Sequence, residues 1–189
     1  MGSMRIVCYA IILIIINSCQ SLQQKNDDLI SGVWANSPGE VKDALAAGAN
    51  ANAATFMTSL DGAPAWTALM LASKNGYSEI VRVLIDAKAD VNAATSRGNT
   101  ALMIASGNGH PEVVKVLISA KADLNAKDLH DWTALITASY QGQTAVVTEL
   151  IAAKAKLNEK DDQSKTALRW ASGNKHIEIV KLLKAAGAR

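Results

Sequence analysis

Few side chains in this sequence are of the types that perform catalysis or bind metals. The 189 residues include three histidines and two cysteines, and both cysteines, Cys8 and Cys19, lie near the N-terminus. The rest of the chain therefore has no thiol for a disulfide or a cysteine-containing metal site. His110 and His176 have no second histidine at ligand spacing, so we interpret them as structural residues. His130 lies in a turn, where it is either a surface contact or without a role.

No residue pattern typical of an enzyme accompanies these side chains. The sequence contains no glycine-rich phosphate loop, no G-x-S-x-G elbow and no H-E-x-x-H helix. Asp161 and Asp162 are adjacent, and adjacent carboxylates in a turn usually point apart. We therefore expect no enzymatic activity, no cofactor and no bound metal. The alternative is an enzyme or a small-ligand-binding protein that uses an insertion at residues 54–66 as its pocket.

The first residues predict export from the cytoplasm. Residues 6–16 form an unbroken apolar run, which is too short for a membrane span of about 20 residues and is typical of a signal peptide. Residues 16–19, Ile-Asn-Ser-Cys, resemble the bacterial lipobox, which implies lipidation of Cys19. A plainly cleaved signal and an uncleaved anchor are the alternatives. Residues 1–3 (MGS) are typical of a cloning scar. Gln20 resembles the residue that follows the cysteine in signals sorted to an outer membrane.

These features predict how the N-terminal part is organised. Residues 1–19 are expected to form the signal peptide, and residues 20–28 a polar tether between the lipid and a folded domain. The domain would then lie on the periplasmic or cell-surface side of a bacterial membrane. It would contact the membrane only through this N-terminal lipid anchor.

Two sequence markers recur at one constant interval in the rest of the chain. The tripeptide Thr-Ala-Leu recurs at Thr67, Thr100, Thr133 and Thr166. An Ala-x-x-Asn run recurs with its asparagines at Asn92, Asn125 and Asn158, which are spaced like the threonines. An earlier copy ends at Asn52, farther from Asn92 than this interval, so the first connection carries an insertion. The markers indicate five units.

Each unit is predicted to contain two short helices. Threonine is a good N-cap, because its hydroxyl accepts a hydrogen bond from a free amide of the first helical turn. In residues 79–87 apolar side chains recur at helical spacing, with Arg82 and Asp86 on the opposite face. A residue that tolerates positive φ is expected between the two helices, at Gly76, Gly109 and Gly142. One helix pair cannot bury its apolar face alone, so the units must stack.

The repeat resembles the ankyrin repeat, whose period of about 33 residues it shares. Residues 98–126 (GNTALMIASGNGHPEVVKVLISAKADLNA) are similar to the family's turn, threonine-led helix, break, second helix and Gly-Ala-Asp-x-Asn exit. The family's Thr-Pro-Leu-His is TALM, TALI or TALR here. Alanine in place of proline still allows the helix to start, whereas the missing histidine removes a hydrogen bond between turns. The resemblance implies an all-α ankyrin-repeat solenoid with capping terminal repeats. Its domain spans residues 29–189, in units of about 29–59, 60–93, 94–126, 127–159 and 160–189.

The resemblance also implies binding to another protein. The formal net charge is only +2, and the basic and acidic residues are spread along the chain without a basic cluster. Nucleic acid is therefore not an expected partner. We expect a monomer that binds a toxin, an effector or an envelope enzyme. It would act either as an inhibitor or immunity protein, or as a scaffold that stabilises the enzyme.

Candidate binding residues fall at the turn tips, at the ends of the first helices and in the insertion. In a solenoid of this kind these positions line one concave side, and exposed apolar side chains there are typical of protein-binding surfaces. We expect the binding residues to be Trp66, Trp132, Tyr140, His130, Leu129, Phe56, Met57, Lys74, Asn99 and Lys165.

The aromatic residues at these positions are expected to differ in burial. Trp66, Trp132 and Tyr140 should be substantially exposed, unless the insertion folds over Trp66 as a lid. Trp170 is aligned with Leu71 in the register of the repeat and is therefore expected in the core.

Overall fold

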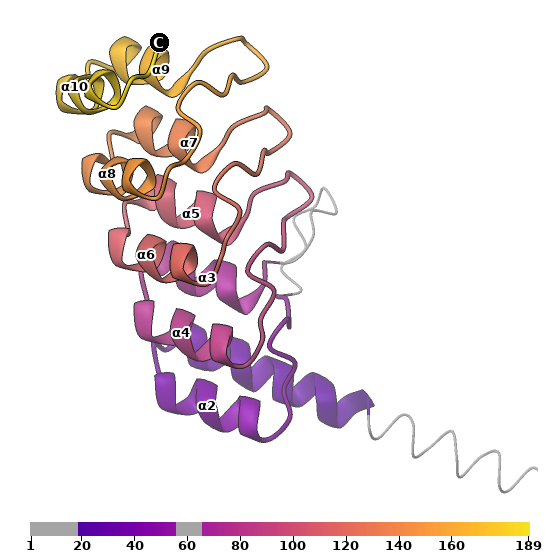
Figure 1. Ribbon diagram of the computed structural model, residues 1–189. Helices are drawn as coiled ribbons and strands as arrows, with labels where there is room; N and C mark the ends of the chain where they lie inside the picture. The colour runs from indigo at the N-terminus through magenta and orange to yellow at the C-terminus, as the bar shows by residue number, and fades with distance from the viewer. Residues whose placement is uncertain (1–18, 56–65) are drawn as a thin grey trace, which may run out of the picture.

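Short helices stacked in pairs make up the computed structural model, which describes residues 19–55 and 66–189 (Figure 1). Among these residues the β contacts are two isolated bridges, Ala54 with Thr67 and Ala94 with Thr100. The predicted all-α fold is confirmed.

The helices alternate between two layers. Residues 19–34 are helical and pair with α2 (Pro38–Ala46). The later pairs are α3 (Ala68–Asn75) with α4 (Ser78–Asp86), α5 (Ala101–Asn108) with α6 (Pro111–Ser119), α7 (Ala134–Gln141) with α8 (Thr144–Ala152), and α9 (Ala167–Gly173) with α10 (Ile177–Ala185). The first helices α3, α5, α7 and α9 pack on one another in turn, and α2, α4, α6, α8 and α10 form the second layer. The connections that follow α4, α6 and α8 project from the same side of the stack (Figure 1).

Residues 20–28, which we expected to form a polar tether, are helical instead and continue into the first unit. Leu29 and Val33 of this helix are fully buried. Asn26 Oδ1 accepts a hydrogen bond of 2.8 Å from the backbone N–H of Asn50. The polar composition that suggested a tether belongs to a solvent-exposed helix, in which glutamine amides bond to aspartates one turn later. Cys19, where this described helix begins, is exposed.

The predicted caps of the first helices are confirmed. In four units the threonine Oγ1 accepts a hydrogen bond of 3.2 to 3.4 Å from the backbone N–H three residues later. Gly76, Gly109 and Gly142 end three of these helices with φ between 75° and 77°. At Gly76 a Cβ would also lie 2.6 Å from Nδ1 of His110. Glycine is therefore required there both by the backbone conformation and by the close approach of the next unit.

Polar side chains connect consecutive units. Asparagine Oδ1 atoms accept hydrogen bonds of 2.7 to 2.9 Å from a backbone N–H of the following unit, at Asn52, Asn92, Asn125 and Asn158. His110 Nε2 donates to the carbonyl of Lys74 at 2.8 Å, and His176 Nε2 donates to that of Tyr140 at 3.0 Å. The two histidines thus join units, as their structural interpretation predicts.

The core consists of alanine and branched aliphatic side chains from both layers. Leu84, Leu117, Leu150 and Leu183 occupy equivalent positions in the second helices, and all four are fully buried. Small alanines on the first helices let neighbouring units approach closely. None of the helices within the described residues combines the length and the apolar character needed to cross a membrane.

Candidate partner-binding site

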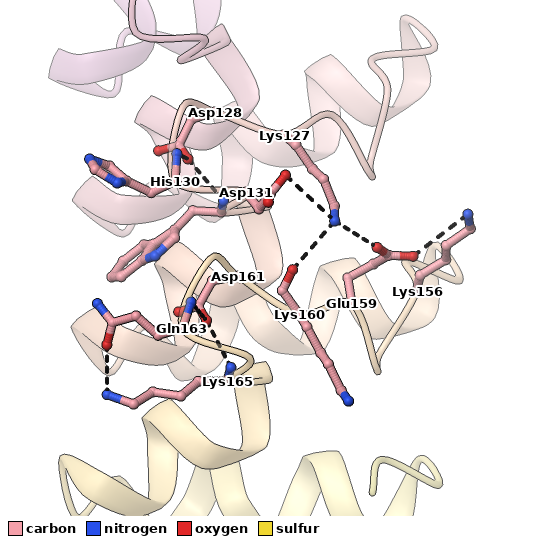
Figure 2. A network of polar contacts seen from close by, with 11 residues as sticks. Lys127, Asp128, His130, Asp131, Lys156, Glu159, Lys160, Asp161, Gln163 and Lys165 are labelled. Carbon is pink, nitrogen blue, oxygen red and sulfur yellow. Dashed lines mark hydrogen bonds and ion pairs between the residues drawn. The ribbon is translucent and has the colours of Figure 1, made fainter.

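Two loops of the same design carry the candidate site. In the loop before α7, Asp128 Oδ1 accepts hydrogen bonds from the backbone N–H groups of His130 and Trp132, both at 2.8 Å. Asp161, the equivalent residue of the next unit, makes the same pair of bonds in the loop before α9, at 3.0 and 2.8 Å. Figure 2 shows both carboxylates turned into their own loops. An aspartate therefore fixes the shape of each turn.

Neighbouring loops are also bonded to each other. The backbone N–H of Leu129 donates to the carbonyl of Arg97 at 2.9 Å, and that of Asp162 donates to the carbonyl of His130 at 3.1 Å. The His130 ring Nδ1 lies 3.0 Å from Asp162 Oδ2. The loops thus form a continuous, hydrogen-bonded surface.

Lys127 strengthens the connection between the two loops. Its Nζ lies 3.2 Å from a carboxylate oxygen of Glu159 and 3.8 Å from one of Asp131, and it donates to the carbonyl of Lys160 at 3.3 Å (Figure 2). Lys156 approaches the other oxygen of Glu159 at 3.7 Å. These groups are partly exposed, so each pair adds little stability by itself. Together they hold the two loops in register.

Trp132, Tyr140 and Trp170 form a cluster of three aromatic rings, supplied by a loop, by α7 and by α9 respectively. The ring centroids lie 5.2 to 5.3 Å apart, and Tyr140 meets both indoles in edge-on geometry. Trp170 Nε1 donates a hydrogen bond of 2.7 Å to Asp161 Oδ2. Asp161 is only 5% exposed, so one buried carboxylate both shapes its loop and orients an indole. Edge-on aromatic pairs of this kind are favourable beyond the area that they bury.

Two lysine side chains lie over indole rings. Lys165 Nζ lies 4.0 Å from the centroid of a Trp170 ring, within the range of a cation–π interaction. Lys74 Nζ lies 5.2 Å from the centroid of a Trp66 ring. We refer to Trp132, Tyr140, Trp170 and Lys165 as the aromatic cluster.

The exposure of the aromatic residues differs from the prediction. Tyr140 is 37% exposed, but Trp66 and Trp132 are half-buried and pack against the core. The expectation of substantial exposure is therefore wrong for both tryptophans. Trp170 is also half-buried and belongs to the cluster, so its assignment to the core is wrong too. The indole of Trp170 is long enough to reach Asp161. Leu71, the equivalent residue of an earlier unit, has a shorter side chain with no hydrogen-bond donor.

The other predicted residues lie in several places. Leu129 is 70% exposed at a loop tip, and His130 is exposed beside it. Asn99 is half-buried and shapes its own loop, since its N–H donates to Thr95 Oγ1 at 3.1 Å. Phe56 and Met57 lie outside the described residues. So does most of the insertion that we considered as a pocket or a lid.

The arrangement offers contact surface for another chain. Within the described residues no group of three or more histidine, cysteine, aspartate or glutamate side chains is placed to hold a metal ion. The aromatic cluster instead presents ring edges, an ammonium group and an exposed leucine at the neighbouring loop tip. These groups suit apolar and polar contacts with another chain.

Comparison with known proteins identifies the repeats. The family described as "Ankyrin repeats (3 copies)" matches residues 33–128 and 127–189. A glycerophosphocholine phosphodiesterase of Schizosaccharomyces pombe is 43% identical over 75 residues, which are 40% of this chain and 6% of that protein. The match spans too little of that phosphodiesterase to transfer its activity. From the family match and the stacked helix pairs, we conclude that the chain belongs to the ankyrin-repeat family, whose repeats generally mediate protein–protein binding.

Proposed function

We propose that this protein is a non-catalytic binding module that captures a protein partner on the aromatic cluster and the adjoining loop tips. The observation that carries the proposal is the packing of Trp132, from the loop before α7, with Tyr140 of α7 and Trp170 of α9 into one group. Tryptophan and tyrosine are the side chains that most often dominate the binding energy of protein interfaces.

Rigidity supports this role. A side chain that is already fixed loses little conformational entropy when a partner binds, so more of the contact energy appears as affinity. Trp132 is held by Asp128 through its backbone, and Trp170 by Asp161 through its indole N–H. Tyr140, the most exposed ring of the cluster, rests on both of them.

We further propose that the domain acts in a bacterial envelope, anchored by a lipid on Cys19, where it inhibits or scaffolds its partner. The support is the apolar run at residues 6–16 and the lipobox-like residues 16–19. Because the helix runs without a break from residue 19 into the first unit, an anchor there would hold the domain close to the membrane surface.

A pull-down from a membrane-containing extract tests the proposed surface. The full chain in detergent is the bait, together with Tyr140→Ala and the control Trp34→Ala, which removes an exposed aromatic residue from the N-terminal helix (52% exposed). Wild type and Trp34→Ala are expected to capture the same protein, and Tyr140→Ala to lose it. Equal capture by all three would show that the partner binds elsewhere.

If the partner is an enzyme or a toxin, its activity with and without this protein separates inhibition from scaffolding.

A further inference from the structure

The charges around the aromatic cluster indicate which partner side chains it accepts. In the two loops, residues 127–132 and 159–165, every carboxylate already has a partner within the loops themselves, at Asp128, Asp131, Glu159, Asp161 and Asp162. Lys165 differs from them. Its ammonium lies over the Trp170 ring and bonds to the neutral amide oxygen of Gln163 at 3.0 Å. No carboxylate among the described residues pairs with it.

The first helices show the same bias in charge. The described helices α3, α5, α7 and α9 contain no acidic residue, and their charged side chains are Lys74 and Arg169. Lys74 lies over Trp66 as Lys165 lies over Trp170. The first helices and the loops before them therefore combine aromatic rings with lysines that have no carboxylate partner among the described residues.

We infer that the aromatic cluster binds an acidic segment of its partner, in which a carboxylate side chain meets Lys165 and a neighbouring apolar side chain packs on Tyr140 and the two indoles. This inference rests on the proposed function, since it names the partner chemistry of the same site. A carboxylate carries the charge opposite to that of the Lys165 ammonium, so a hydrogen bond between them is stronger than the present bond to a neutral amide oxygen. The ring beneath the ammonium holds it in place before the partner arrives.

Two labelled peptides test this inference on the full chain in detergent micelles. One alternates glutamate with leucine, and the matched peptide has lysine in place of glutamate. Fluorescence anisotropy is expected to show binding of the glutamate peptide only, with affinity falling as salt is added. Lys165→Gln should bind the glutamate peptide about tenfold more weakly than wild type. Lys160→Gln is the control, because it removes the same charge from the same loop and its ammonium points away from Lys165 (Figure 2).

Three results would overturn the inference: binding of neither peptide, equal binding of both, or equal affinities for Lys165→Gln and Lys160→Gln. A failure here is distinguishable from a failure of the proposed function. If Tyr140→Ala loses the natural partner while Lys165→Gln keeps it at full affinity, the binding surface stands and its preference for an acidic segment is wrong.

Discussion

Three lysines occupy backbone positions that favour glycine. Lys88, Lys121 and Lys154 follow the second helices with φ between 65° and 67°, and the equivalent positions in the first and last units hold Gly48 and Gly187. A side chain in this left-handed region costs about 1–2 kcal/mol, because Cβ crowds the following carbonyl oxygen. The ankyrin pattern has glycine at this position, and the central units depart from it.

Replacing one of these lysines with glycine is expected to stabilise the protein. In Lys121→Gly the relief of backbone strain stabilises the folded state by more than the added conformational entropy of glycine stabilises the unfolded chain. The free energy of unfolding should therefore rise by about 0.5–1 kcal/mol. Chemical denaturation measures the change in the free energy of unfolding. Lys115→Gly, in the middle of α6, is the control and should destabilise by at least about 1 kcal/mol, because glycine disfavours the helix and the change also removes the ion pairs with Glu112 and Glu149. Destabilisation by both variants would contradict the strain at Lys121.

Cys19 carries the prediction of a lipid anchor. If it is lipidated, cells that express the protein should incorporate a labelled fatty acid into wild type but not into Cys19→Ala. Cys19→Ala should also remain an uncleaved precursor, because cleavage of a lipobox requires the modified cysteine. Mass spectrometry and metabolic labelling measure both effects. Identical labelling of the two forms would refute lipidation at this residue.

At the scale of single residues, the sequence predicted backbone roles better than side-chain burial. Threonine and glycine act through local hydrogen bonds and φ, so Thr67 and Gly76 were placed correctly from the repeat alone. Trp132 and Trp170 were misplaced, because the burial of a large ring depends on neighbours from other units. The bond from Trp170 to Asp161 joins residues only nine positions apart, but nothing in the repeat predicts it, since no other unit has both residues.

Buried serines recur on the first helices. The hydroxyl oxygens of Ser73, Ser106 and Ser139 are buried and have no hydrogen-bond partner in the described structure. The equivalent Ser172 is exposed and donates to the carbonyl of Leu168 at 2.8 Å. A buried hydroxyl without a partner loses its hydrogen bonds to water on folding, which opposes stability.

Ser106→Ala is therefore expected to raise the free energy of unfolding by about 1 kcal/mol. Helix α5 should tolerate the change, because alanine is smaller than serine and a better helix former. Ser172→Ala is the matched control and should change stability little. Denaturant titration of both variants checks this expectation. Destabilisation by Ser106→Ala would mean that its hydroxyl has a partner in solution.

At the scale of elements, the constant period of the repeat predicted the helix pairs and their order, because identical units fold alike and need each other's apolar faces. The N-terminal helix was not predicted over residues 20–28. That segment is outside the regular register and mostly polar, and its helix is stabilised by docking through Leu29, Val33 and Asn26. Docking of this kind is a tertiary interaction that local composition does not show.

The described helices form a stack in which the most extensive contacts of each helix pair are with the adjacent pairs. Helix α6 packs between α4 and α8, whereas α10 has α8 on one side. Leu117 and Leu183 are equivalent residues of these two helices, and both are fully buried. Replacing Leu117 with alanine should cost about 2–5 kcal/mol, because it opens a cavity between three units.

Leu183→Ala should cost less, because the last unit can relax or fray without breaking the rest of the stack. Denaturant unfolding of the two variants, followed by circular dichroism, measures the difference. Equal losses of stability would argue that the domain unfolds as one globule with no distinction between central and terminal units.

We propose the aromatic cluster as the recognition surface, and the affinity of the captured partner decides whether it has this role. Isothermal titration of that partner into wild type, Tyr140→Ala and Trp34→Ala gives the three dissociation constants, and thermal unfolding shows that each variant is folded. Losing a central aromatic anchor typically costs about 2 kcal/mol or more, roughly thirtyfold in affinity. We predict that loss for Tyr140→Ala, with wild-type affinity for Trp34→Ala. Full affinity in a folded Tyr140→Ala would show that the partner binds elsewhere.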